Sequence, residues 1–170
     1  HEIEDTAEYL SSLNCKFTFM HCVSIYPTPI KEGHLNRIDY LKSLTDSVGF
    51  SEHSNYESCG LKLASMALTK DITWLERHFT SIDKSKTKDG KVSLNRMQLA
   101  ELLHLTNLTS KELVEHVGNN ICIDEQKLML GKKNRNLSEV EKLNRDYYHG
   151  RFANKNNGKV MFNWQWDYNE

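Results

Sequence analysis

Apolar positions recur with two different periods over the first hundred residues. Residues 3–13 repeat apolar side chains three and four positions apart, which predicts an amphipathic helix. The same spacing predicts further helices at residues 35–44, 55–68 and 94–103, the last with Ser93 as its N-cap. Shorter apolar runs lie between these helices, and we interpret them as buried strands at residues 16–23, 48–51 and 72–79.

Helices and strands alternate strictly in this prediction, which is the pattern of βαβ units in a parallel sheet. A closed barrel of such units needs about eight strands, so the chain is expected to form part of an α/β structure. From Thr109 the pattern becomes helical. Helices are predicted from 109 to 117, ended by Gly118, from 124 to 130, and from 138 to 148 with Ser138 and Glu141 as a capping box. An aromatic tail follows at residues 160–166.

Composition narrows the classes of partner. The chain is 38% apolar and 26% charged, with a net charge of −1, which gives no support to a nucleic-acid partner. No apolar run approaches the roughly 20 residues that span a bilayer, and the polar start predicts no secretory signal. The four cysteines form no CxxC pair, so we expect reduced thiols, with Cys15 and Cys22 buried, in a cytoplasmic protein.

Two predicted strands end in a histidine, His21 and His53. Parallel strands would bring both to one rim, where neutral imidazoles are suitable metal ligands. Each could equally be a buried histidine satisfied by the backbone. His78 ends the third strand with the same two alternatives, and Glu52 is expected to point away from His53 because side chains alternate.

The loop after the third strand is rich in lysines. Such a run either neutralises an anionic substrate or forms a solvated face, and the sequence leaves both open. The lysines concerned are Lys84, Lys86, Lys88 and Lys91.

Three segments together resemble signatures of one family. They are MHCVSIYPTP at residues 20–29, GFSEHS at 49–54 and LERHFT at 75–80. Their order and spacing are similar to those of the sialic acid synthases, which also make related nonulosonic acids. The resemblance is clear over residues 3–103.

This resemblance implies a TIM barrel that joins phosphoenolpyruvate to an N-acyl-hexosamine such as N-acetylmannosamine and releases phosphate. It implies a divalent metal, usually manganese, held by His21 and His53. It also implies substrate-binding residues on the same rim, namely Tyr26, Glu52, His78 and Asp83. We therefore expect residues 1–108 to be the C-terminal part of the barrel, strands six to eight. Residues 109–170 are expected to be a helical extension without the antifreeze-like domain that often follows.

The chain departs from the family pattern in two respects. The early segments that carry an acidic residue and a phosphate-binding lysine and serine are absent, and Gly90 replaces a family histidine beside Asp89. A noncatalytic remnant or interaction module that assembles with another chain is therefore the alternative. The expected partners are the two substrates and either a second copy of the chain or a missing N-terminal half of the barrel.

Overall fold

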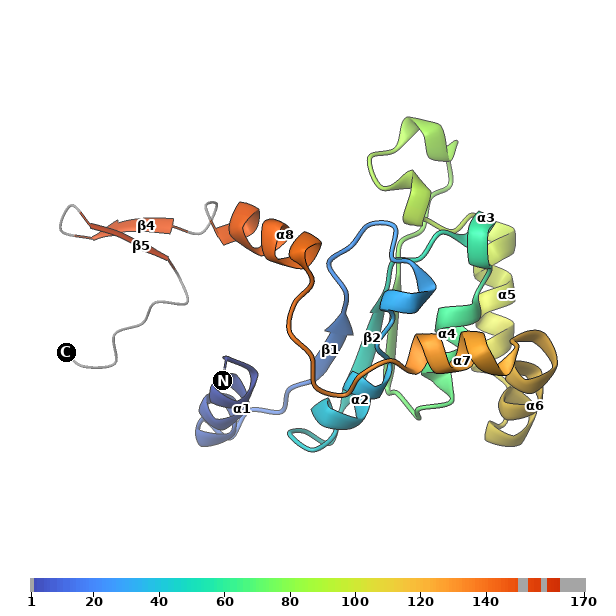
Figure 1. Ribbon diagram of the computed structural model, residues 1–170, viewed down its shortest axis with the longest axis horizontal. Coiled ribbons are helices and arrows are strands. Elements are labelled where there is room, and N and C mark those ends of the chain that lie inside the picture. The colour runs from blue at the N-terminus through green and yellow to red at the C-terminus, as the bar shows by residue number, and fades with distance from the viewer. Residues whose placement is uncertain (1, 150–152, 157–158, 163–170) are drawn as a thin grey trace. The chain divides into compact units, whose positions relative to one another are not determined.

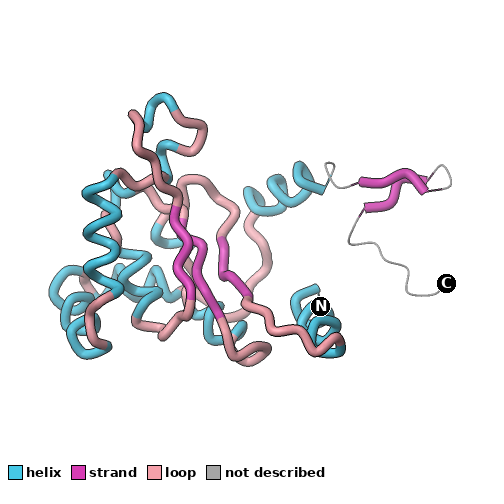
Figure 2. Tube along the Cα trace, turned by 180° about the vertical axis from the view of Figure 1, so that it is seen from behind, coloured by secondary structure: helices cyan, strands magenta, loops and turns pink. Residues whose placement is uncertain are grey.

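The computed structural model describes residues 2–149, 153–156 and 159–162, which form two compact units, residues 1–135 and 136–170. In the first unit, three parallel strands lie in the order β1 (Phe19–Cys22), β2 (Val48–Glu52) and β3 (Trp74–Arg77). Figure 1 and Figure 2 show helices interleaved with these strands along the chain. The α/β prediction is confirmed, with strands at the predicted places; β1 and β3 are shorter than predicted, and β2 extends one residue further.

The sheet has two chemically different faces. In the parallel register His21 lies beside Phe50 and Phe50 beside Leu75, while Cys22 lies beside Ser51 and Ser51 beside Glu76. Because side chains alternate along a strand, the first set shares one face, which we call the helix-covered face. The second set shares the other, which we call the open face.

The open face also carries Met20, Gly49 and Trp74. A Cβ atom at Gly49 would lie 2.2 Å from Met20 Sδ and 2.8 Å from Trp74 Cβ, so the two neighbouring side chains close over the glycine. Trp74 nevertheless keeps 58% of its surface exposed. This face of the sheet is therefore apolar in part and uncovered.

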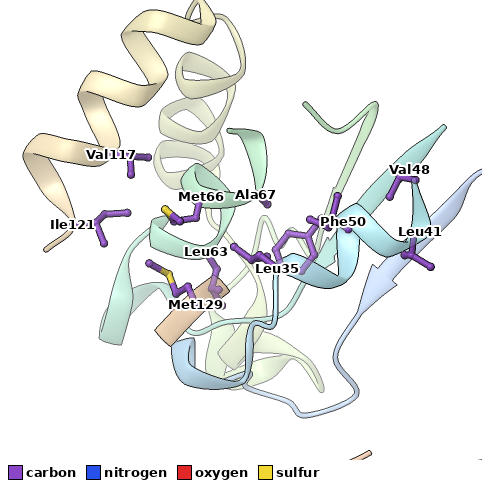
Figure 3. Close-up of a cluster of buried hydrophobic side chains, with 11 residues drawn as sticks. Leu35, Leu41, Val48, Phe50, Leu63, Met66, Ala67, Val117, Ile121 and Met129 are labelled. Atoms are coloured by element: carbon purple, nitrogen blue, oxygen red, sulfur yellow. The ribbon is translucent and has the colours of Figure 1, made fainter. Parts of the chain in front are cut away.

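The main core lies on the helix-covered face. Its buried strand side chains are Val48 and Phe50, and Figure 3 shows them together with the other buried side chains of the same cluster. The helices concerned are α2 (Asn36–Leu41), α4 (Lys62–Leu68), α6 (Ser110–Asn120) and α7 (Ile123–Leu130). Burying a side chain of this size stabilises the fold by about 1.5–3 kcal/mol, so α6 and α7 are part of the core rather than an appendage.

That packing explains where the first unit ends. Val117, Ile121 and Met129 belong to the main core, and the unit extends to Arg135, beyond the predicted boundary at residue 108. Gly118 does not end the helix as predicted, because α6 continues to Asn120. Tertiary contacts of the apolar face outweigh the poor helix propensity of one glycine.

The long helix predicted at residues 55–68 is divided in two. Helix α3 (Tyr56–Cys59) ends at Gly60, whose φ of 59° lies in the left-handed region, and α4 begins two residues later. Glycine adopts that conformation without steric cost, so Gly60 turns the chain between the two helices.

Helix α5 (Arg96–Thr106) begins later than predicted. Asn95, not Ser93, is its N-cap, in a capping box with Gln98. Leu94 instead bridges in parallel to Phe79 and packs in a second apolar cluster with Leu102 and Leu105. Ser93 donates its hydroxyl to the Asp89 carbonyl at 2.9 Å. The backbone at Ser93 is therefore extended, and Leu94 pairs with Phe79, two residues after the end of β3.

The remaining elements of the first unit are short, apart from the first helix. Helix α1 (Glu2–Ser12) agrees with the prediction, and three 3-10 turns occupy loops. They are η1 (Ile30–Glu32), η2 (Lys84–Lys86) and η3 (Gly90–Val92). The last two shape the lysine-rich loop after β3.

The second unit contains α8 (Glu139–His149) and an antiparallel pair, β4 (Ala153–Asn156) with β5 (Lys159–Phe162). The predicted capping box is confirmed, since the Ser138 amide donates to Glu141 Oε2 at 2.9 Å and the Glu141 amide donates to Ser138 Oγ. The sequence reasoning missed this pair of strands. The aromatic tail beyond Phe162 lies outside the described residues.

Within the described ranges, no helix is both long and apolar enough to cross a membrane. The four cysteines, all in the described part, form no disulfide. The prediction that Cys15 and Cys22 are buried is wrong, since both are exposed. Cys22 is exposed because it points to the open face.

Candidate active site at the carboxyl ends of the strands

His53 follows β2 directly and is buried, with 4% of its surface exposed. Its ring centroid lies 4.2 Å from that of Tyr26 and 5.1 Å from that of His78, both edge-on. Its Nδ1 lies 3.9 Å from Cys22 Sγ. The carboxyl ends of all three strands thus contribute to one cluster.

The loop after β1 is held against this cluster. The Thr28 amide donates to the His53 carbonyl at 2.9 Å, and the Thr28 hydroxyl donates to the Ile25 carbonyl at 2.7 Å. These bonds fix the YPTP segment, whose Tyr26–Pro27 peptide is cis. Tyr26 is therefore positioned beside His53 while 47% of its surface stays exposed.

His53 is electrically neutral at physiological pH. Burial, and after it the charge that His78 can carry, lowers the pKa of His53 to about 4. A neutral imidazole keeps a lone pair for a metal ion or for a substrate hydroxyl.

His21 lies on the other side of the sheet. Its ring stacks on Phe50 at a centroid distance of 5.5 Å, and its Nε2 lies 2.8 Å from the Gly33 carbonyl oxygen. A carbonyl only accepts, so Nε2 carries the hydrogen and donates. Gly33 is itself packed against α4, because a Cβ there would lie 2.4 Å from Leu63 Cδ2. His21 is a buried, backbone-satisfied histidine.

The structure therefore pairs His53 with His78 and not with His21. The register explains this, because Ser51 lies beside Glu76 and His53 and His78 each come two residues later. They share a face, whereas His21 lies beside Phe50 on the opposite one. The sequence offered His78 only as a separate strand-end histidine, because the register that pairs it with His53 is set by the contacts between the strands.

Glu52 also points to the helix-covered face, as alternation predicts. It is 1% exposed and forms an ion pair with Arg77, and its Oε1 accepts from the Ser54 amide at 2.6 Å. Arg77 Nη2 donates to the Ser54 carbonyl at 2.6 Å. Burial lowers the pKa of Arg77 to about 10, so its guanidinium remains charged at neutral pH. Glu52 joins two strands rather than lining the rim.

Asp83, which the family resemblance placed on the rim, has a local partner. Its carboxylate accepts from the Ser85 amide at 2.9 Å and from the Ser85 hydroxyl at 2.8 Å. These bonds hold its pKa below the usual range. Asp83 is the N-cap of η2 and so shapes the loop.

The rim offers some, but not all, of the protein ligands that a metal ion usually has. His53 and His78 offer two imidazoles, a ligand type that divalent transition metals accept. In the described portion of the chain, no third histidine, cysteine or carboxylate completes a cluster. His21 does not fit this site because its ring lies on the opposite face. A metal here would take its other ligands from water or substrate.

Comparison with known proteins gives this geometry a context. The model of the NeuB family matches residues 1–117. The N-acetylneuraminate-9-phosphate synthase of Mus musculus is 33% identical over 109 residues, 62% of this chain and 29% of that protein. The N,N'-diacetyllegionaminic acid synthase of Campylobacter jejuni is 30% identical over 105 residues, 59% of this chain and 30% of that protein.

The fold is similar to that of a solved structure. The crystal structure of the spore coat polysaccharide biosynthesis protein spsE from Bacillus subtilis superimposes with a TM-score of 0.66 at 25% identity, over 89% of this chain and 40% of that one. The chain thus spans about a third of the length of the curated relatives it matches. With the family model covering more than half of its residues, the chain belongs to the NeuB family of sialic acid synthases.

Proposed function

We propose that this chain forms part of a synthase that joins phosphoenolpyruvate to an N-acyl-hexosamine such as N-acetylmannosamine and releases phosphate. The observation that supports it is the pairing of His53 with His78 beside Tyr26, at the carboxyl ends of parallel strands. That edge is where barrels of this kind carry their chemistry. The type of reaction is inferred from membership of the NeuB family.

A divalent metal, manganese by the family resemblance, would be held by His53 and His78 and would polarise the sugar aldehyde as a Lewis acid. His21 is not among these proposed ligands, because its ring faces the opposite side of the sheet and its Nε2 donates to the Gly33 carbonyl. The Tyr26 ring lies against His53, and its hydroxyl, 3.9 Å from Cys22 Sγ, is a group that can donate to a sugar oxygen. The Thr28 bond to the His53 carbonyl keeps both rings in place.

The proposed reaction forms a bond between C3 of phosphoenolpyruvate and the aldehyde carbon of the open-chain sugar. Water adds at C2 of the former enol, and the bond from C2 to the phosphate oxygen then breaks. The phosphate-binding lysine and serine of the family pattern have no counterpart in this chain. We propose that β1, β2 and β3 are strands six to eight and that the rest of a barrel, from the same protein or another chain, binds phosphoenolpyruvate.

The test has two parts. Manganese binding to the full chain is measured from the electron paramagnetic resonance signal of the unbound ion, for wild type, His53→Ala and His78→Ala. Each substitution is expected to weaken binding about tenfold or more, which is about 1.4 kcal/mol. His21→Gln is the matched control and is expected to bind as wild type does.

Activity is measured on the complete gene product, including any residues encoded before His1. Phosphate release from phosphoenolpyruvate is expected with N-acetylmannosamine or a diamino-hexose and is lost in His53→Ala and His78→Ala. Full activity in both variants would contradict the site. Loss of metal binding in His21→Gln, with binding retained in His78→Ala, would instead support His21 and His53 as the ligands, as the family resemblance implies.

A second function rests on a different observation. Trp74 and Cys22 are exposed on the open face, where a complete barrel would enclose them. A noncatalytic module that assembles with another chain through this face is therefore the alternative. Metal binding distinguishes the two functions, because the synthase requires a bound metal and a noncatalytic module that only assembles with another chain does not.

A further inference from the structure

A buried ion pair lies on the helix-covered face of the sheet, opposite the two rim histidines. Glu52 precedes His53, Arg77 precedes His78, and the strand register places Glu52 beside Arg77. Because side chains alternate along a strand, the charged pair occupies the helix-covered face and the histidine pair the open face. Each member of the ion pair is thus joined by one peptide bond to one member of the histidine pair.

Arg77 holds the chain on both sides of His53. Its guanidinium forms the ion pair with Glu52 and donates from Nη2 to the Ser54 carbonyl at 2.6 Å. Glu52 Oε1 in turn accepts from the Ser54 amide at 2.6 Å. The residues before and after His53 are therefore bound by one planar cation, and its rigid donor geometry restricts the peptide units between them.

Two backbone hydrogen bonds hold the histidine residues themselves. The Thr28 amide donates to the His53 carbonyl at 2.9 Å, and the Leu94 amide donates to the His78 carbonyl at 2.8 Å. Neither bond links the end of β2 to the end of β3. The ion pair does so, at the last paired position of the two strands, and the histidines follow immediately beyond it.

Stability alone does not account for this ion pair. The Glu52 and Arg77 side chains are only 1% and 3% exposed, and the cost of desolvating two charges can exceed the energy of their attraction. Arg77 Nε is also buried and has no hydrogen-bond partner among the described residues, which adds a further cost. Apolar side chains of similar volume often stabilise a core equally well. The pair therefore contributes a defined arrangement of the strand ends rather than net stability.

We propose that Glu52 and Arg77 are positioning residues that set the separation of the His53 and His78 rings on the opposite face of the sheet. The inference rests on the proposed function and deepens it, because it names groups that act on the proposed metal ligands without touching metal or substrate. The two ring centroids lie 5.1 Å apart in the folded chain. Ligands that are already held at a fixed separation do not have to be ordered when a metal binds.

The ring contacts are measured from nuclear Overhauser effects in the full chain, with isotope-labelled histidine and tyrosine. Wild type is expected to show a cross-peak between His53 and His78 and another between His53 and Tyr26, whose centroids lie 5.1 and 4.2 Å apart. The double variant Glu52→Leu/Arg77→Met is expected to lose the cross-peak between the histidines. It is expected to keep the cross-peak to Tyr26, since the loop after β1 is held by its own hydrogen bonds.

Manganese affinity is measured for the same proteins from the electron paramagnetic resonance signal of the unbound ion. The double variant is expected to bind about tenfold or more weakly than wild type, the usual effect of removing groups that orient metal ligands. Arg77→Lys keeps the charge without the planar fork, and it carries the same expectations in case the double variant does not fold. Lys62→Met/Glu125→Leu is the matched control, because it removes an ion pair of 2.6 Å between α4 and α7. It is expected to change neither measurement.

Urea denaturation identifies the variants that are folded. A folded variant of Arg77 that keeps both cross-peaks and binds manganese as wild type does would overturn the inference, because the ion pair would then be structural only. A wild type without the cross-peak between His53 and His78 would overturn it too. A wild type that shows this cross-peak and binds no manganese, with the cross-peak lost in the double variant, would contradict the proposed function alone.

Discussion

The imidazole of His21 shows how burial decides the role of a single residue. It is 4% exposed, and burial lowers its pKa from 6.5 to about 4 although the Gly33 carbonyl favours the charged form. The unfolded chain therefore binds a proton more readily than the folded chain between these two values. The contribution of His21 to the free energy of unfolding is therefore present in full above pH 6.5 and is lost as the pH falls toward 4.

His21→Gln removes this titration and keeps an amide donor for Gly33. Between pH 7.5 and 4.5, wild type is expected to lose about 2.5 kcal/mol more free energy of unfolding than His21→Gln, measured by urea denaturation. His104→Gln, at an exposed position of α5, is expected to behave as wild type does. An equal loss in wild type and His21→Gln would contradict the burial of this ring.

Between elements, the ion pair of Glu52 and Arg77 is a buried polar link. It joins neighbouring positions of β2 and β3, and both side chains are almost fully buried, 1% and 3% exposed. Removing one partner leaves a buried charge without its counterion, which typically costs about 3–5 kcal/mol. Replacing both by apolar side chains avoids that cost.

Glu52→Leu and Arg77→Met are each expected to lower the free energy of unfolding by about 3–5 kcal/mol in urea denaturation. The double variant is expected to lose less than the sum, although Ser54 also loses its bond from Arg77. Asp124→Asn, which removes an exposed pair with Lys127, serves as the control at about 0–1 kcal/mol. Strict additivity of the two single substitutions would show that the pair is not coupled.

At the scale of the whole molecule, the first unit covers one face of its sheet and leaves the other exposed. Helices α2, α4, α6 and α7 bury Val48 and Phe50, while Trp74 on the open face is 58% exposed. Uncovered strand edges and apolar faces favour association with another chain. The isolated chain is expected to self-associate through this face.

Sedimentation equilibrium tests this expectation. Wild type is expected to sediment above the monomer mass of 19.8 kDa, and Trp74→Lys to shift toward the monomer because a charge opposes burial of the open face. Met97→Lys replaces another exposed apolar side chain, on α5, and is expected to leave the mass unchanged. A monomeric wild type would contradict assembly through the open face.

The sequence by itself determined the three parallel strands, most of the helices and the family of this protein. Apolar spacing gave three strands in alternation with helices, and the capping box at Ser138 marked the start of α8, because both depend on local residue order. The three motifs around His21, His53 and His78 together identified the resemblance to the sialic acid synthase family.

Only the tertiary structure decided which of these residues meet. The parallel register sends His21 and Glu52 under the helices and His53 and His78 to the open face, and a pairing between strands cannot be read from either strand alone. The contact of Gly90 with the Lys84 carbonyl likewise depends on how the loop closes. Local residue order determines which element each side chain belongs to, whereas the pairing of segments distant in the sequence determines which side chains are in contact.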